Sequence, residues 1–243
     1  SKVPEVTLAF WIIKILATTL GETGGDAVSM SMNLGYLIGT AIFGIVFVAA
    51  VGFQIRAPRF HSAIYWFSII ASTTVGTTLA DFATRSLGIG YTGGSAILLV
   101  LVLGSLFLWK RVTGSISVSD VSSPRTELFY WLTITFSQTL GTALGDWTAD
   151  TANLGYVGAA GVFGGLLILV AGAYYFTSAS RTILFWVAFV LTRPLGAVVG
   201  DFLDKPVSHG GLEFSRFTAS AILIVAIVGL IALLPHRAAK RAH

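Results

Sequence analysis

Four acidic side chains recur at one position of an internal repeat, within segments that are otherwise apolar. A Trp lies ten residues before a Gly and an Asp lies five residues after it: Trp11, Gly21 and Asp26; Trp66, Gly76 and Asp81; Trp131, Gly141 and Asp146; Trp186, Gly196 and Asp201. An ionisable group inside a membrane is costly and marks a functional site by default. The repeated carboxylates therefore predict a site that binds a cation or exchanges a proton.

Further acids accompany the repeated Asp residues. Glu22 lies four residues before Asp26, Asp150 lies four after Asp146, and Asp204 lies three after Asp201. Side chains at these spacings share one face of a helix. The motifs are rich in hydroxyl and amide oxygens and contain no Cys or His, a ligand set that suits Mg²⁺, Mn²⁺ or Ca²⁺ better than Zn²⁺ or Cu⁺. The predicted ion-binding residues are Glu22, Asp26, Asp81, Asp146, Asp150 and Asp201, and the strongest metal ligands among them are Glu22, Asp26, Asp146 and Asp150.

Two cations lie within the apolar segments. Lys14 follows Trp11 by three residues, and Arg193 takes the place that Thr18, Thr73 and Gln138 hold in the other copies. Both are expected to face the protein interior and to meet acids there, so Lys14, Arg193, Gln138 and Asp204 are predicted to support the site. In the alternative, structural interpretation, each Asp caps a helix end or pairs with Arg85, Arg193, Lys14 or Lys205.

The glycines of the motif predict close helix packing. The pairs Gly21 and Gly25, Gly76 and Ala80, Gly141 and Gly145, and Gly196 and Gly200 each place two small residues four apart. Such pairs let two helices approach closely in lipid. Each Asp directly follows the second small residue. Four such helices in contact would bring four carboxylates to a shared axis.

Composition sets the class of protein. Of the 243 residues 55% are hydrophobic and only 11% are charged, and the mean hydropathy is +0.84. Soluble domains carry about 25% charged residues, so the chain has too little polar surface for a water-facing globule. We expect an integral membrane protein whose main partner is the lipid bilayer. The net charge of +4 relates to topology and does not indicate a nucleic-acid partner.

Eight segments approach the length of about 20 mostly apolar residues that a spanning helix needs. They are Val6–Ser29, Tyr36–Phe53, His61–Thr84, Tyr91–Trp109, Glu127–Ala149, Tyr156–Phe176, Thr182–Leu203 and Phe214–Leu234. The predicted fold is an all-α polytopic membrane protein with eight transmembrane helices, formed by four tandem, parallel helical-pair repeats. Residues 1–112 hold repeats 1 and 2, residues 113–125 form a hydrophilic linker, and residues 126–243 hold repeats 3 and 4 with a basic tail.

Loop charges predict the orientation in the membrane. One side would carry Lys2, Arg56, Arg59, Lys110, Arg111, Arg125, Arg181, Arg237, Lys240 and Arg241, and the other only Arg85, Lys205 and Arg216. Positively charged loops stay in the cytoplasm, so both termini are expected there. The repeated Trp would then lie at the inner interface as part of an aromatic belt. The four Asp residues, fifteen positions further along, would share one depth in the outer part of the membrane.

The layout of four two-helix repeats with one Trp each resembles a family of bacterial membrane proteins known as a tandem repeat of unknown function. The resemblance covers nearly the whole chain and rests on the four Trp–Gly–Asp sets. It implies eight spans and a location in the bacterial inner membrane. It implies no activity, so the function has to be inferred from the residues.

Two classes of function remain open. The first is a secondary transporter or exporter of a small cation, most simply a divalent metal ion, with a proton-linked organic cation as second choice. The second is a scaffold, assembly factor or sensor in which the motifs only pack helices and form ion pairs. No nucleotide-binding loop, HExxH motif or Ser-His-Asp set is present, so an enzyme is not expected. No cofactor is expected beyond a bound divalent cation, and the oligomeric state, including a homo-oligomer, is left open.

Overall fold

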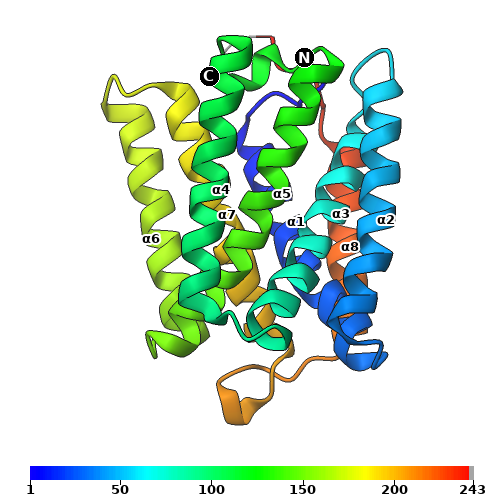
Figure 1. The fold of residues 1–243 in the computed structure, drawn as a ribbon, viewed down its shortest axis with the longest axis vertical. Helices are drawn as coiled ribbons and strands as arrows, with labels where there is room; N and C mark the ends of the chain where they lie inside the picture. The colour runs from blue at the N-terminus through cyan, green and yellow to red at the C-terminus, as the bar shows by residue number, and fades with distance from the viewer. Residues whose placement is uncertain (241–243) are drawn as a thin grey trace.

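In the part of the chain that the structure describes, the protein is a bundle of eight α-helices, as the apolar segments predicted (Figure 1). The computed structural model describes residues 1–240. The helices are α1 (Leu8–Asp26), α2 (Gly35–Arg56), α3 (Ser62–Asp81), α4 (Gly90–Thr113), α5 (Pro124–Asp146), α6 (Gly155–Phe176), α7 (Arg181–Asp204) and α8 (Arg216–Leu233). The all-helical class and the division into four helical pairs are confirmed.

The helices around the linker are longer than expected. α4 continues to Thr113 and ends at Gly114, whose φ of 81° reverses the chain. α5 begins at Pro124 because the Ser123 hydroxyl accepts a hydrogen bond from the Thr126 amide. A Ser that caps a helix whose first residue is Pro is a strong start signal. The segment between the two helices is therefore shorter than the predicted linker of residues 113–125.

Six of the eight helices are long and apolar enough to cross a membrane: α2, α3 with its extension to Ser86, α4, α6, α7 and α8. The other two, α1 and α5, carry several of the charged residues of the motifs. Large apolar side chains on the outer helices are exposed, for example Ile45 of α2, Leu103 of α4 and Ile168 of α6. Apolar surface of this kind is what a bilayer covers, which supports a polytopic membrane protein.

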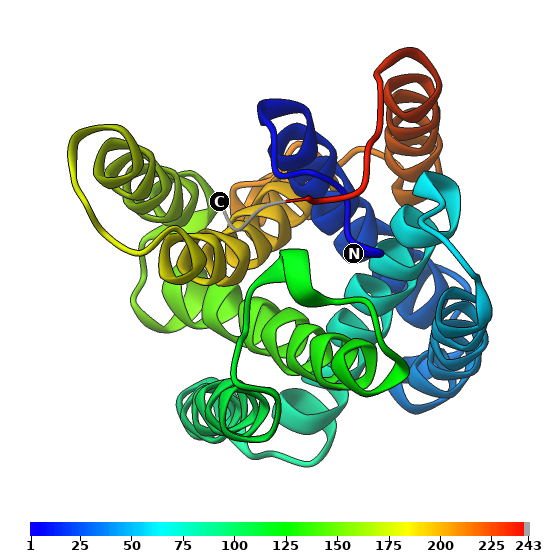
Figure 2. The ribbon, with the colours of Figure 1, turned by 90° about the horizontal axis from the view of Figure 1, so that it is seen from above.

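The odd-numbered helices form a closed inner ring. α1 contacts α3, α3 contacts α5, α5 contacts α7, and α7 returns to α1. Seen from above, these four helices surround one axis while the even-numbered helices lie outside them (Figure 2). First and last repeats are therefore neighbours in space. The bundle has approximate fourfold symmetry about this axis.

Each outer helix packs mainly on the inner helix of the following repeat. α2 packs on α3, α4 on α5, α6 on α7, and α8 closes the ring on α1. A sequence repeat is thus not a self-contained helical hairpin. Because each repeat covers its neighbour, the four repeats depend on one another for burial of their apolar faces.

A widened helical turn follows the repeated Asp in three copies. The π-helical turns Ala27–Ser31, Phe82–Ser86 and Trp147–Thr151 continue α1, α3 and α5, whereas α7 stays α-helical to Asp204. Isolated π-helical turns are frequently found at functional sites. The chain then reverses at Gly35, Gly90 and Gly155, each with positive φ. This left-handed conformation explains the constant Gly fourteen residues after the first.

Both termini lie at one end of the bundle, which we call the terminal end (Figure 1). There Pro4 and Ala238 form an antiparallel bridge, and the Glu5 amide donates to the Arg237 carbonyl at 2.8 Å. The Lys2 ammonium lies 2.7 Å from the Glu127 carboxylate of α5. The two ends of the chain therefore lie together across this face. The four repeated Asp residues lie at the opposite end, which we call the far end.

The repeated Trp residues do not form a lipid-facing belt, so that expectation was wrong. Trp66, Trp131 and Trp186 are buried in the aromatic core at the terminal end, and only Trp11 is partly exposed. The Trp186 ring nitrogen donates to the Ile116 carbonyl at 2.9 Å. The reason is that these residues lie on inner helices, whose sides are covered by neighbouring helices instead of by lipid.

Candidate functional site

Glycine contacts hold the inner ring together in a cyclic pattern. A Cβ on Gly21 would meet Thr73, one on Gly76 would meet Gln138, one on Gly141 would meet Arg193, and one on Gly196 would meet Thr18. The four partners occupy one equivalent position in the repeats. Each inner helix thus offers its glycine to the side chain of the next one. Close approach of this kind requires the absence of a Cβ.

We expect Gly141→Ala to destabilise the protein by about 1–3 kcal/mol, because the added methyl group would overpack the contact with Arg193. The α-carbon of Gly165, on exposed α6, faces open space. Gly165→Ala is the matched control and should leave stability unchanged or raise it by about 1 kcal/mol. Thermal unfolding of the detergent-solubilised protein measures both. Equal melting temperatures for the two variants would rule out the packing role.

The inner helices present a stack of buried residues to the axis. These residues recur every four positions, so successive layers lie about 6 Å apart along each helix. We call them the axial column: Phe10, Tyr65, Tyr130 and Phe185; Lys14, Ile69, Ile134 and Phe189; Thr18, Thr73, Gln138 and Arg193; Glu22, Thr77, Thr142 and Ala197; Asp26, Asp81, Asp146 and Asp201. All of them are buried. The column changes from aromatic at the terminal end to acidic at the far end.

The last layer of the column and Asp204 form a cluster that we call the carboxylate cluster. Lys205, which directly follows α7, forms a close ion pair with Asp26 and lies 3.0 Å from Asp201 and 4.0 Å from Asp204. Burial lowers the pKa of Lys205, but the Asp201 and Asp26 carboxylates outweigh this and hold the pKa above its ordinary value. The ammonium is therefore charged at neutral pH.

Two arginines complete the ion pairs of the cluster. The Arg85 Nε lies 2.9 Å from Asp81, and its Nη2 lies 3.2 Å from Asp146, so that Arg85 joins α3 to α5. The Arg216 Nε donates to Asp204 at 2.9 Å. Five carboxylates thus face three basic side chains. The cluster has a formal excess of two negative charges.

Carboxylate oxygens converge at two places. Oxygens of Glu22, Asp26 and Asp81 lie within 4.8 Å of one another, and so do oxygens of Asp26, Asp201 and Asp204. Asp26 belongs to both groups. Its Oδ1 is buried and has no hydrogen-bond partner among residues 1–240. A buried polar atom without a partner is unusual in a folded protein and calls for a ligand or a water molecule.

Glu22 belongs to the layer before the cluster and pairs with Arg193. The Arg193 Nη2 donates to Glu22 at 3.0 Å and to the hydroxyls of Thr77 and Thr142 at 2.6 Å each. Both charged side chains are buried. One nitrogen of α7 therefore contacts α1, α3 and α5 at the centre of the bundle.

Lys14 does not meet an acid, so that expectation was wrong. Its ammonium lies 4.1 Å from the centre of the Phe189 ring and donates a long hydrogen bond of 3.4 Å to Thr192. Within residues 1–240, no carboxylate lies within 4.0 Å of it. Glu22 is two helical turns away, about 12 Å along α1, and is already paired with Arg193.

The structure separates the predicted site residues. Glu22, Asp26, Asp81, Asp201 and Asp204 belong to the two converging groups. Asp146 belongs to neither group but is buried and pairs with Arg85, whereas Asp150 belongs to neither and is exposed. Asp150 lies in the π-helical turn Trp147–Thr151, where a wider turn changes the angle between successive side chains. Gln138 is buried beside Gly76, and its amide has no hydrogen-bond partner in the described chain.

Two parts of the site were not found by reasoning from the sequence. Arg216 was counted only among the loop charges, and Thr77 and Thr142 were not distinguished from the other hydroxyl oxygens of the motifs. The aromatic layer of the column was missed entirely, although its signal was present because Phe or Tyr precedes every repeated Trp. In that layer the Tyr65 and Tyr130 hydroxyls share a hydrogen bond of 2.6 Å.

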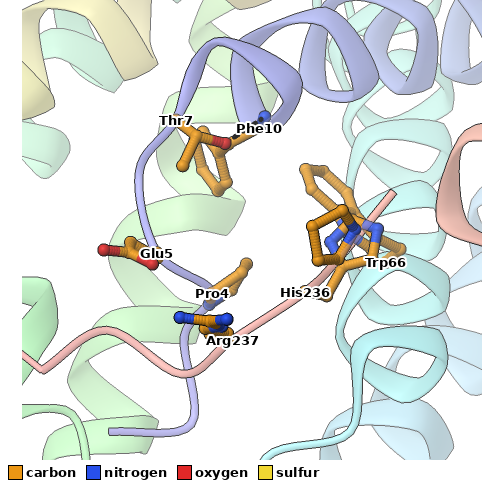
Figure 3. Close-up of a pocket in the computed structure, with 8 residues that line it drawn as sticks. Pro4, Glu5, Thr7, Phe10, Trp66, His236 and Arg237 are labelled. Carbon is orange, nitrogen blue, oxygen red and sulfur yellow. Dashed lines mark hydrogen bonds between the residues drawn. The ribbon is translucent and has the colours of Figure 1, made fainter. Parts of the chain in front are cut away.

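A cavity of about 180 Å³ opens at the terminal end, above the aromatic layer. In Figure 3, Phe10 and Thr7 lie on one side of it, and Trp66 and His236 on the other. The Trp66 Nε1 and His236 Nε2 atoms are buried and lack hydrogen-bond partners in the described chain. Phe10 of the aromatic layer lines the cavity, whereas none of the repeated Asp residues does.

Comparison with known proteins identifies a repeat family. The family model described as "Repeat of Unknown Function (DUF347)" matches four tandem segments, residues 9–60, 64–115, 129–180 and 184–238. Each segment contains one Trp–Gly–Asp set and one inner and one outer helix, which confirms the resemblance drawn from the motifs. No curated protein and no solved structure matches the chain.

Proposed function

The chain belongs to this family of repeats of unknown function, and we propose that it is a carrier of small divalent cations in the bacterial inner membrane. In this proposal all eight helices cross the membrane and both termini face the cytoplasm. The carboxylate cluster at the far end, together with Glu22, binds the transported ion. The proposal involves no chemical reaction and no resident cofactor.

The observation that carries the proposal is the convergence of Glu22, Asp26 and Asp81. Their oxygens lie within 4.8 Å of one another, all three residues are buried, and Asp26 Oδ1 lacks a partner within the described residues. Three carboxylates at this separation repel one another unless a positive charge lies between them. A cation supplies that charge and a partner for the unused oxygen.

The donor atoms favour a hard divalent ion. The ligands in reach are carboxylate oxygens, with hydroxyl oxygens such as that of Thr77, which lies 3.3 Å from Glu22. Hard cations such as Mg²⁺, Mn²⁺ and Ca²⁺ prefer oxygen ligands. The formal excess of two negative charges in the carboxylate cluster also favours binding of a cation over binding of an anion or a neutral molecule.

Loop charges support the proposed orientation. The terminal end carries Arg59 in the α2–α3 loop and Arg56, Arg111 and Arg181 at the adjoining helix ends (Figure 1). An excess of Lys and Arg marks the cytoplasmic side of a membrane protein. The carboxylate cluster would then lie near the periplasmic side, and the cavity near Trp66 would open to the cytoplasm.

Asp26→Asn tests the proposal directly. The purified protein is reconstituted into vesicles, and uptake of Mn²⁺, Mg²⁺ and Ca²⁺ is measured. We expect Asp26→Asn to reduce uptake of the transported ion about tenfold to a hundredfold, since a bond to a charged group contributes about 1.5–3 kcal/mol. Asp150→Asn is the matched control, because it removes the same charge from the exposed residue. It should transport like the wild type.

Two results would contradict the carrier proposal. One is wild-type protein that is folded in the vesicles and moves none of the three ions. The other is Asp26→Asn protein that moves every tested ion at the wild-type rate. Either result would leave the carboxylate cluster without a role in transport.

The second candidate function is a membrane scaffold or sensor. The observation that favours it is that each acid of the carboxylate cluster, and Glu22, has a basic partner within 4.0 Å. If the cluster only holds helices together, divalent cations should not change the melting temperature. A carrier that binds the ion in its folded state should melt at a higher temperature in saturating Mn²⁺.

A further inference from the structure

We propose that Lys205 competes with the transported ion. When no ion is bound, the Lys205 ammonium occupies one of the two converging carboxylate groups. The inference rests on the proposed function and concerns the regulation of the same site. Lys205 is not part of the repeated motif, and the other repeats have no Lys at the equivalent position: these positions hold Met30, Arg85 and Asp150.

The Lys205 ammonium lies among the carboxylates of one converging group. Lys205 lies within 4.0 Å of all three carboxylates of the Asp26, Asp201 and Asp204 group. This is the arrangement expected of a bound cation, supplied here by the chain itself. An ion that uses both oxygens of Asp26 must take Asp26 Oδ2 from Lys205, because that oxygen is the one in the ion pair.

Hydrogen bonds of the loop after α7 anchor the Lys205 backbone. The loop after α7 folds back, so that the Leu212 amide donates to the Phe202 carbonyl at 2.7 Å, Glu213 to Lys205 at 3.0 Å, and Phe214 to Leu203 at 2.8 Å. The main chain is therefore fixed at the far end of the bundle. A lysine has a flexible four-carbon stem, so its ammonium can leave the cluster while its backbone stays in place.

Lys205 lowers the negative charge of the carboxylate cluster in the empty carrier. With Lys205 in place the cluster has a formal excess of two negative charges, and without it the excess is three. Buried charge without compensation is costly in a membrane. Lys205 therefore reduces the negative charge that the empty carrier moves across the membrane. In the loaded carrier, a bound Mn²⁺ ion reduces this charge instead.

The test separates net uptake from exchange with the full-length protein in vesicles. Labelled Mn²⁺ is added outside vesicles that contain either no Mn²⁺, for net uptake, or unlabelled Mn²⁺, for exchange. We expect Lys205→Met to lose net uptake by about tenfold or more while exchange stays within about twofold of wild type. Lys205→Arg, which keeps the charge, should recover most of the net uptake.

A binding measurement in detergent accompanies the flux. Mn²⁺ should bind about tenfold more tightly to Lys205→Met than to the wild type, because the competing ammonium is gone. Arg59→Met is the matched control, because it also removes one positive charge but from an exposed residue of the α2–α3 loop at the terminal end, away from the carboxylate cluster. It should retain net uptake. If Lys205→Met does not yield folded protein, Lys205→Gln is measured in its place.

The outcomes distinguish the role of Lys205 from the proposed carrier function. Net uptake by Lys205→Met at the wild-type rate overturns the role of Lys205 and leaves the carrier intact. Loss of net uptake and exchange together, in protein that is folded, also overturns it, since Lys205 would then be a structural residue. If the wild type shows neither mode, the proposed function falls, and the role of Lys205 falls with it.

Discussion

Arg193→Met is expected to lower the free energy of unfolding by about 3–5 kcal/mol, because it leaves the buried Glu22 carboxylate without its partner. Arg193 and Glu22 are both buried, and the same Arg193 nitrogen also contacts Thr77 and Thr142. The substitution therefore removes one contact to each of the other three inner helices. Loss of folded protein after extraction in detergent is the expected signature.

A second substitution shows whether the charge or the shape of Arg193 matters. In the double variant Arg193→Met with Glu22→Gln, the unpaired charge is gone, and a well-packed neutral pair can be as stable as a buried ion pair. We expect this variant to recover most of the lost stability in thermal unfolding. A double variant as unstable as Arg193→Met alone would show that Arg193 acts through packing against Gly141 instead of through its charge.

Arg85→Met is expected to have the next largest effect on stability, about 2–4 kcal/mol. The substitution leaves Asp81 and Asp146 without a basic partner, and loss of a buried pair costs up to about 5 kcal/mol, less where the cation is partly exposed as here. Arg85 also lies 3.4 Å from the Tyr36 hydroxyl and faces the Tyr91 ring. Its loss therefore loosens the far ends of the first three repeats together.

The same variant distinguishes the two candidate functions. Removal of Arg85 raises the negative charge of the carboxylate cluster, so a cation-binding protein should gain a larger increase in melting temperature from Mn²⁺ than the wild type does. Arg59→Met is the control, because Arg59 is exposed at the terminal end. An Arg85→Met protein that is destabilised and insensitive to Mn²⁺ would support the scaffold.

Residues that recur in all four repeats and residues that occur in one repeat have different roles in the bundle. The glycine contacts and the repeated Asp residues follow the fourfold pattern, so they build the frame. Lys14, Glu22, Arg193 and Lys205 each occur in one repeat only. Lys14, Glu22 and Arg193 make the axial column asymmetric, and Lys205 adds a single ammonium to the carboxylate cluster.

The sequence by itself determined the class, the helices and the repeated frame. Long apolar segments separated by polar turns leave only helices as a solution in lipid, because each backbone group must find its partner within its own segment. The start of α5 was predicted three residues too late, at Glu127, because Ser123 and Pro124, which cap and begin the helix, were assigned to the linker. The spacing of glycine and Asp also determined that the carboxylates would lie beside a helix contact.

Only the tertiary structure decided which helices meet and which charges pair. The order of the ring, with α8 closing on α1, depends on contacts between residues far apart in the chain. For this reason Arg193 of α7 pairs with Glu22 of α1, and Arg85 joins Asp81 to Asp146. Spacing along one helix could not distinguish Asp26 from Asp150, because burial depends on the neighbours that surround a residue. The two acids have opposite environments, one inside the ring of helices and the other beyond its far end.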